Sequence, residues 1–222
     1  MPRAYAASVP PASELQAVEA PPSTLRERLL AEPERAPELV ALAASERFAE
    51  PARRWAERMA AHGYTPEEMA RIAVRRHTRI ARAEGAVIGL GGAITAAADL
   101  VGLAWVQSRM VFFVAAAHGY DPAHPMRPAE LLALHDLYET PAAAKAALDG
   151  VGQSLAAALA SRTLDRGRDQ TLRRRLLGFV GRKVAKRAVA RAIPFLASPI
   201  SAVQNGNLTS QMGARALRYY GG

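Results

Sequence analysis

One stretch limits the possible folds of this chain more than any other, namely GAVIGLGGAITAAADLVGLAWVQSRMVFF at residues 85–113. It is rich in glycine and alanine and carries only two charged side chains, Asp99 and Arg109. Three structures suit such a composition: a loop that cradles a phosphate, a helix that crosses a membrane, or helices that pack closely against their neighbours.

Motif spacing and run length separate these three structures. The segment GLGGAI, which begins at Gly89, has Ile94 where a dinucleotide-binding loop needs its third glycine, and no lysine follows as in a P-loop. A transmembrane helix needs about 20 mostly apolar residues. The uncharged runs at 85–98, 100–108 and 110–117 are only 14, 9 and 8 residues long. We therefore expect neither a nucleotide loop nor a membrane span here.

Close helix packing remains, because small residues recur every four positions. Gly85, Gly89, Ala93 and Ala97 form a smooth strip against which another backbone can lie. We expect residues 85–118 to form an apolar, Gly/Ala-rich helical hairpin. Whether this hairpin faces lipid or the protein core stays open, because the spacing serves both.

The whole chain reads as all-α. Alanine, leucine, arginine and glutamate dominate its 222 residues, and no segment alternates apolar and polar residues as a strand does. We predict one multi-helix bundle without a sheet, formed by residues 25–222, after a Pro/Ala-rich disordered arm at 1–24. The predicted helices are 37–62, 66–84, 86–98, 99–118, 127–138, 142–161, 170–192 and 200–219.

A repeated phrase marks two of the helix ends. AAHGYTP at 60–66 and AAHGYDP at 116–122 each place a histidine in a last helical turn and a glycine at a left-handed stop. Thr65 or Asp121 can then cap the next helix, with Pro66 or Pro122 at its first position. His62 and His118 are therefore predicted to support helix C-termini rather than catalysis.

Several kinds of site are excluded or disfavoured. The chain has no cysteine, which excludes disulfides, thiolate metal sites and cysteine nucleophiles. No serine lies in a G-x-S-x-G elbow. His135 and Glu139 in HDLYE are an i, i+4 pair, a weak metal or acid–base candidate that also suits a salt-bridged surface turn. We assign no catalytic residue and expect neither a cofactor nor a metal.

Positive charge is concentrated in one segment. Residues 162–191 contain eleven basic and two acidic side chains, which accounts for the whole net charge of +9. The helix predicted over 170–192 is amphipathic, with a basic side opposite Leu176, Leu177 and Val180. A solvated helix face remains the plain alternative to an anion-binding surface. The predicted anion-binding residues of this helix are Arg174, Arg175, Arg182, Lys183 and Lys186.

A second basic face is predicted on the helix over 66–84. At about 100° per residue, Arg71, Arg75, Arg79 and Arg82 fall within an arc of about 80°. The sequence therefore predicts a stripe of four arginines along this helix, which we add to the lipid- or anion-binding set.

The order of these motifs resembles that of the EcsC family, prokaryotic proteins named for a gene of an ABC exporter operon. The resemblance rests on GAVIGLGGAITAAADLVGL, then Arg109 and AAHGYDP, and on the ending KVAKRAVARAIPFLASPISAVQNGNLTSQMGARALRYY. It extends over roughly residues 65–220. It implies an α-helical protein associated with the cytoplasmic side of a membrane, and it implies no particular reaction.

Asp99 stands out within the shared motif, because an ionised carboxylate among apolar residues is costly unless it is paired, capping or solvated. It could cap a helix that begins at Leu100, or pair with Arg109 or with a basic residue of the 170–192 helix. In the functional interpretation, Asp99, Arg109, Lys183 and Asn205 line a polar notch that meets a lipid headgroup or small ligand.

The charge pattern leaves two main functions and a third. We expect a non-catalytic, membrane-peripheral accessory protein that binds anionic lipid through its basic helix and apolar hairpin, at the cytoplasmic face of the cell membrane, in support of an ABC exporter. A nucleic-acid-binding protein is the first alternative, although only Phe179 offers a stacking ring within the basic segment. A membrane-associated hydrolase of unknown substrate is the second. The sequence sets no oligomeric state.

Overall fold

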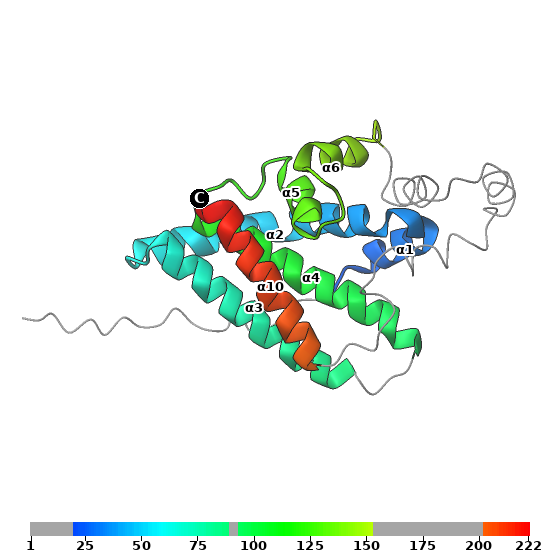
Figure 1. Cartoon of the computed structure of the whole chain (residues 1–222), viewed down its shortest axis with the longest axis horizontal. Coiled ribbons are helices and arrows are strands. Elements are labelled where there is room, and N and C mark those ends of the chain that lie inside the picture. The colour runs from blue at the N-terminus through cyan, green and yellow to red at the C-terminus, as the bar shows by residue number, and fades with distance from the viewer. Residues whose placement is uncertain (1–19, 89–92, 153–201) are drawn as a thin grey trace, which may run out of the picture.

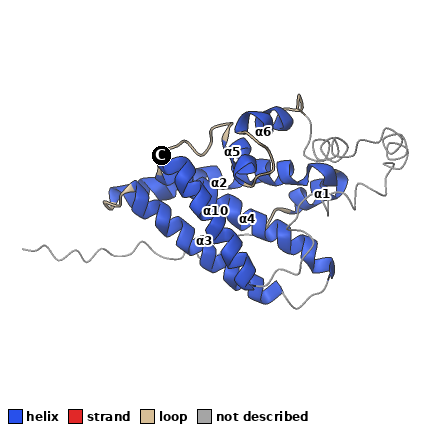
Figure 2. Ribbon diagram, viewed as in Figure 1, coloured by secondary structure: helices blue, strands red, loops and turns tan. Residues whose placement is uncertain are grey.

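The computed structural model describes residues 20–88, 93–152 and 202–222, and it describes side chains in these ranges except at 84–100 and 202–204. All regular structure in these ranges is helical, which confirms the predicted all-α fold (Figures 1 and 2). The helices are α1 (Ser23–Ala31), the 3-10 helix η2 (Pro33–Arg35), α2 (Ala36–Ala61), α3 (Pro66–Ile88), α4 (Ala93–Ala117), α5 (Arg127–Leu134), α6 (Pro141–Leu148) and α10 (Ala202–Gly221).

Helix α4 lies at the centre of the bundle and packs against α2, α3 and α10. The rings of Phe48 and Trp105 lie 4.7 Å apart, and those of Trp55 and Phe113 5.2 Å apart, so large aromatic side chains join α2 to α4. From Met110 to Ala117 every side chain of α4 is buried. The C-terminal half of the predicted apolar hairpin is therefore protein core, and it is not available to lipid.

Helix α10 runs antiparallel to α3 and also contacts α4 (Figure 1). Two buried glycines permit the close approach to α3. A Cβ atom at Gly213 would lie 2.5 Å from Cγ1 of Val74, and one at Gly206 would lie 2.4 Å from Cγ of Arg82. Residues more than a hundred positions apart in the sequence thus form one of the most extensive helix pairs of the molecule.

The first AAHGY turn has the predicted geometry. Gly63 adopts φ +83°, and Thr65 and Glu68 form a reciprocal capping box at the start of α3. The backbone N–H of Thr65 donates to the Glu68 carboxylate at 2.8 Å, and the N–H of Glu68 donates to Oγ1 of Thr65 at 3.3 Å. His62 Nδ1 lies 2.7 Å from the carbonyl oxygen of Arg58, as predicted for a side chain that supports a helix end.

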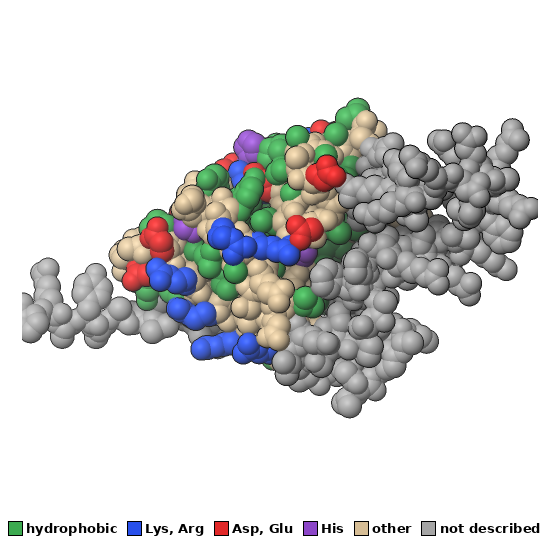
Figure 3. All heavy atoms as spheres, in the orientation of Figure 1, with side chains coloured by type: hydrophobic (Ala, Val, Ile, Leu, Met, Phe, Trp, Pro, Cys, Tyr) green, Lys and Arg blue, Asp and Glu red, His purple; other side chains and the backbone are tan. Residues whose placement is uncertain are grey.

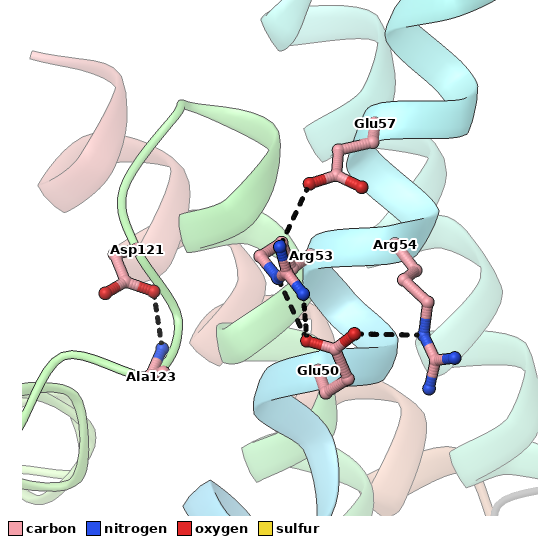
Figure 4. A network of polar contacts seen from close by, with 6 residues as sticks. All are labelled: Glu50, Arg53, Arg54, Glu57, Asp121 and Ala123. Atoms are coloured by element: carbon pink, nitrogen blue, oxygen red, sulfur yellow. Dashed lines mark hydrogen bonds and ion pairs between the residues drawn. The ribbon is translucent and has the colours of Figure 1, made fainter.

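The second AAHGY turn differs after its glycine. Gly119 adopts φ +79°, but no helix begins at Pro122, and that part of the prediction is wrong. Asp121 instead accepts a hydrogen bond from the backbone N–H of Ala123 at 3.0 Å in a local turn (Figure 4). Pro125 explains the difference, because it has no N–H and disfavours helical backbone at the preceding residue. The next helix, α5, begins at Arg127.

The boundaries within the Gly/Ala-rich stretch were also predicted wrongly. Helix α3 continues to Ile88, and α4 runs from Ala93 to Ala117 without a break at Asp99. Asp99 therefore does not cap a helix that begins at Leu100. The physical reason is that AAADLVGLAW offers strong helix formers and no proline, so nothing stops the helix there, whereas three glycines lie between residues 89 and 92.

Two further helix ends were predicted wrongly. Helix α5 ends at Leu134 and not at residue 138, and α6 ends at Leu148 and not at 161, since Gly150 adopts φ +76° just after it. The helix predicted over 170–192 lies outside the described residues. Residues 1–19 of the predicted disordered arm also lie outside them, while the end of that range is helical because α1 begins at Ser23.

Candidate functional site

The exposed side of α3 carries the predicted arginine stripe. Arg71, Arg75, Arg79 and Arg82 are all exposed, while Ala70, Ala73, His77 and Ala81 on the other side of the helix are buried. Basic side chains follow the line of α3 across the surface in Figure 3. We call these four residues, Arg71, Arg75, Arg79 and Arg82, the α3 arginine face.

The α3 arginine face has little internal neutralisation. Arg71 Nε donates to the backbone carbonyl of Glu67 at 3.1 Å. Arg75, Arg79 and Arg82 form no ion pair with any residue whose side chain the structure describes. Their guanidinium groups therefore have no acidic partner among those residues.

Arginines on α2 provide a direct contrast. Arg53 contacts both Glu50, at 2.6 Å, and Glu57, at 3.5 Å, and Arg54 Nε lies 3.4 Å from Glu50 (Figure 4). The hydrogen bonds that Arg53 donates to the Glu50 side chain, followed by the charges of Glu50 and Glu57, raise the pKa of Arg53. Exposed arginines on this helix are thus neutralised by neighbours one turn away, unlike those of the α3 arginine face.

One member of the α3 arginine face is fitted onto a second helix. The stem of Arg82 passes over Gly206 of α10, because a Cβ atom at that position would lie 2.4 Å from both Cγ and Nε of the arginine. The missing side chain at Gly206 therefore leaves room for Arg82 to lie flat across α10. The contact extends the basic surface from α3 toward its neighbour.

The residues predicted for the basic amphipathic helix cannot be placed. Arg174, Arg175, Arg182, Lys183 and Lys186 lie outside the described residues. The α3 arginine face is accordingly the part of the predicted anion-binding set whose geometry is known.

The predicted polar notch is placed only in part. Arg109 is buried in α4, with its guanidinium carbon 5.1 Å from the ring centroid of Phe113. Asn205 is buried on α10. Asp99 lies in α4, but its side chain is outside the described set, as is Lys183. The contacts that the structure gives place Arg109 beside the α2–α4 aromatic core and Asn205 on the α10 face that also carries buried Thr209.

Buried polar groups do gather where α3, α4 and α10 meet. Gln107 Nε2 of α4 donates to Oγ1 of Thr209 on α10 at 3.4 Å. Three further buried atoms, Nε2 of His77, Oγ1 of Thr78 and Oδ1 of Asn205, have no hydrogen-bond partner within the described part of the chain. The members of this group come from three helices, so spacing along any one helix could not have predicted them as a set.

His77 is held neutral. Its Nδ1 donates to the carbonyl oxygen of Ala73 at 2.7 Å. The centroid of its ring lies 5.6 Å from that of Phe113, in an edge-to-face arrangement. Burial, followed by the positive charges of Arg109 and Arg76, lowers the pKa of His77 to about 3, despite the opposing hydrogen bond to Ala73. A neutral, fully buried imidazole of this kind is a structural group at neutral pH.

A second polar cluster lies where α5 meets the end of α10. Arg127 and Glu130 form a buried ion pair, and the hydroxyl of Tyr220 donates to Glu130 at 2.7 Å. The guanidinium carbon of Arg127 lies 5.2 Å from the ring centroid of Tyr120 and 5.6 Å from that of Tyr220, and these two rings are in contact with each other. Burial and the charge of Glu130 raise the pKa of Tyr220. Each polar side chain of this cluster has a partner, so the cluster anchors α10 and leaves no group free for a ligand or a reaction.

The HDLYE segment does not present the predicted helical pair. Helix α5 ends at Leu134, so His135 and Glu139 do not share a helix face. Burial and the charge of Arg215 lower the pKa of His135 to about 4. Within the described ranges no group of three or more potential His, Asp or Glu ligands lies close enough to hold a metal ion.

The order of motifs and the all-helical architecture can now be compared with known families. A family model described as the EcsC protein family matches residues 46–221, which is most of the chain. The chain belongs to the EcsC protein family. No curated protein and no solved structure shows significant similarity to it. The matched range of this EcsC-family chain includes the α3 arginine face, the buried polar groups and α10.

Among the helices in residues 20–88, 93–152 and 202–222, none combines the length and the apolar character that a membrane-crossing segment requires.

Proposed function

We propose that this EcsC-family chain is a non-catalytic, membrane-peripheral protein that binds anionic lipid headgroups through the α3 arginine face. One observation carries the proposal: four exposed arginines form a row on one helix, and three of them have no acidic partner within the described residues. A localised row of unneutralised positive charge attracts an anionic surface.

The length and charge of the row suit a membrane surface. With a rise of about 1.5 Å per residue, Arg71 and Arg82 are separated by about 16 Å along the helix axis. Each basic residue near an anionic bilayer contributes about 1 kcal/mol, so the four together contribute about 4 kcal/mol before entropy losses. This energy supports reversible binding that weakens as salt is added.

The apolar hairpin contributes through one end only. The side chains of α4 from Met110 to Ala117 are buried, so the proposed lipid contact of the hairpin is made by residues that precede them. Val101 and Gly102 are partly exposed. Residues 85–88 are the last turn of α3, directly after Arg82, so the arginine row leads toward that end. The basic segment 162–191 adds further positive charge to the same proposed role.

The proposal includes a location and a partner class. The proposed location is the cytoplasmic face of the cell membrane, because anionic lipid in that leaflet would attract a row of arginines. The resemblance to proteins named for an ABC exporter operon extends the proposal to the support of a membrane transporter.

Vesicle binding tests this function. Full-length protein is sedimented with vesicles of phosphatidylcholine alone and of phosphatidylcholine mixed with phosphatidylglycerol. We expect binding to the anionic vesicles only, and a loss of roughly 30-fold in the partition coefficient for the double variant R75Q/R79Q, which removes about 2 kcal/mol of attraction.

The matched control is R53Q/R54Q, which removes the same charge from α2, where Glu50 and Glu57 already neutralise both arginines. We expect its partition coefficient to change by less than about twofold. Equal losses in the two double variants would reject the α3 arginine face as the contact site. Binding that ignores headgroup charge, or stronger binding to duplex DNA at the same salt concentration, would reject the lipid function.

A further inference from the structure

An open hollow lies between the end of α5 and the last turns of α10. It encloses about 440 Å³ and contains no residue of the α3 arginine face. This size lies within the range of about 300–1,000 Å³ that is usual for small-molecule sites. Its lining residues are Ala133, Leu134, Asp136, Arg215, Arg218 and Tyr219.

The first arginine of the hollow is fixed in position. Nη1 of Arg215 donates to the carbonyl oxygen of Leu134 at 3.0 Å and also to the carboxylate of Asp136. These two contacts hold the guanidinium plane, while its Nε and Nη2 groups have no hydrogen bond to any described residue. Asp136 also neutralises the charge of Arg215. Arg215 is thus a preorganised donor with unused N–H groups.

Asp136 adopts an uncommon backbone conformation to make this contact. Its φ is +57°, the left-handed position after a helix that usually holds glycine. The N–H of Asp136 donates to Ala133 at 2.9 Å, and the N–H of Leu137 donates to Leu132 at 3.1 Å, as in a Schellman end. A glycine would suit this backbone better, but it would have no carboxylate to hold Arg215.

The second arginine is available to a ligand. Arg218 follows Arg215 by three positions on α10, so both lie on one side of the helix. It is exposed and forms neither a hydrogen bond nor an ion pair with a residue of the described ranges. Beside it, Tyr219 is 44% exposed, and its ring is supported by Tyr220 at 4.9 Å in an edge-to-face arrangement.

We propose that this hollow binds a small carboxylate that carries an apolar, aromatic body. Arg218 and the free N–H groups of Arg215 would hold the carboxylate, while Leu134, Ala133 and the Tyr219 ring would contact the body. Two arginines and one aspartate leave a net charge of +1, which matches a monoanion. A phosphate dianion would bring a second negative charge close to Asp136.

The hollow is open to solvent, so the affinity is modest, with a dissociation constant on the order of 1 mM. The test is a titration of the full-length, isotope-labelled protein with sodium benzoate, followed by amide chemical shifts. We expect saturable shifts at residues 133–136 and 215–219. Benzamide, which lacks the charge, and acetate, which lacks the ring, should each bind at least about fivefold more weakly.

Two variants locate the site. R218Q should weaken benzoate binding about tenfold, because it removes the free guanidinium. R54Q makes the same change in net charge on α2 and should leave benzoate binding unchanged. Each spectrum also shows whether the variant is folded. The proposal is overturned if benzoate produces no saturable shifts, if benzamide binds equally well, if R54Q weakens binding as much as R218Q, or if phenyl phosphate binds more tightly than benzoate.

The result is independent of the lipid function. R218Q leaves the α3 arginine face intact, so it should not change the binding of anionic vesicles. Loss of vesicle binding in R75Q/R79Q should in turn leave benzoate binding intact. Each proposal can therefore fail without the other.

Discussion

The packing of α10 on α3 predicts that Gly213→Ala destabilises the protein, although alanine is the better helix former. A Cβ atom at position 213 would lie 2.5 Å from Cγ1, 3.0 Å from Cγ2 and 3.3 Å from Cβ of Val74. Val74 is β-branched and therefore has one strongly preferred rotamer in a helix. It cannot rotate away, so α10 has to move away from α3.

The expected cost follows from two opposing terms. Overpacking a well-filled interface costs about 1–3 kcal/mol, and two methyl groups inside the contact distance place this case in the upper part of the range. Replacing glycine by alanine within a helix regains about 1 kcal/mol. The net loss should be about 1–2 kcal/mol in the free energy of unfolding, which lowers Tm by roughly 3–8 °C for a chain of this size.

Urea unfolding followed by circular dichroism measures this difference, with two other helical glycines as matched controls. Gly102 has nothing within 4 Å of its Cβ direction, so Gly102→Ala should gain about 0.5–1 kcal/mol. The three atoms nearest to a Cβ at Gly206 are Cγ, Nε and Cδ of the flexible Arg82 side chain, so Gly206→Ala should change the free energy of unfolding by less than about 0.5 kcal/mol.

A second-site variant makes the reasoning refutable. Val74→Ala removes the two methyl groups that block the new Cβ, so the double variant V74A/G213A should be more stable than the sum of the single effects by at least about 1 kcal/mol. Strictly additive effects, or a G213A protein as stable as G102A, would show that α10 does not lie against α3 at the distance described here.

Two further predictions concern buried polar groups. The pKa of His77 is lowered to about 3 in the fold against an ordinary value of 6.5, so the unfolded chain takes up a proton first as pH falls through this window. At pH 5 the free energy of unfolding is therefore lower than at pH 7 by about 2 kcal/mol. H77Q should reduce the pH dependence of urea unfolding by that amount. An unchanged dependence would refute the assignment. Tyr138 donates to the buried carboxylate of Glu38 at 2.5 Å, so Y138F should cost about 1–3 kcal/mol in thermal unfolding, and a neutral effect would contradict this.

The parts of the fold that short sequence patterns control could be predicted. The AAHGYTP turn is built from contacts between residues close in sequence, and its left-handed glycine and the Thr65 cap occur as expected. The α3 arginine face follows from helical periodicity alone, since the period places residues 71, 75, 79 and 82 together. The all-helical fold class was predicted correctly from composition, because alanine and leucine, which favour helices, dominate the chain.

Other features depend on contacts between distant residues, and these could not be predicted. Glu130 and Tyr220 are ninety positions apart, and Tyr138 and Glu38 a hundred, so no local pattern links them. The break at Asp99 was predicted wrongly because aspartate favours helix caps, whereas the surrounding helix formers and the lack of proline let α4 continue through it. Arg215 and Asp136 meet only because α10 returns to α5, so the hollow has no sequence signature.

The position of α10 also has a kinetic consequence. This helix packs against α3 and α4 but is separated from them by about a hundred residues. A newly made chain therefore has to close a long loop before α10 can cover the two helices. Until then, the small and apolar side chains of α3 and α4 that α10 covers remain exposed and can contact other molecules. The time that α10 takes to dock therefore sets how long this surface stays exposed in a newly made chain.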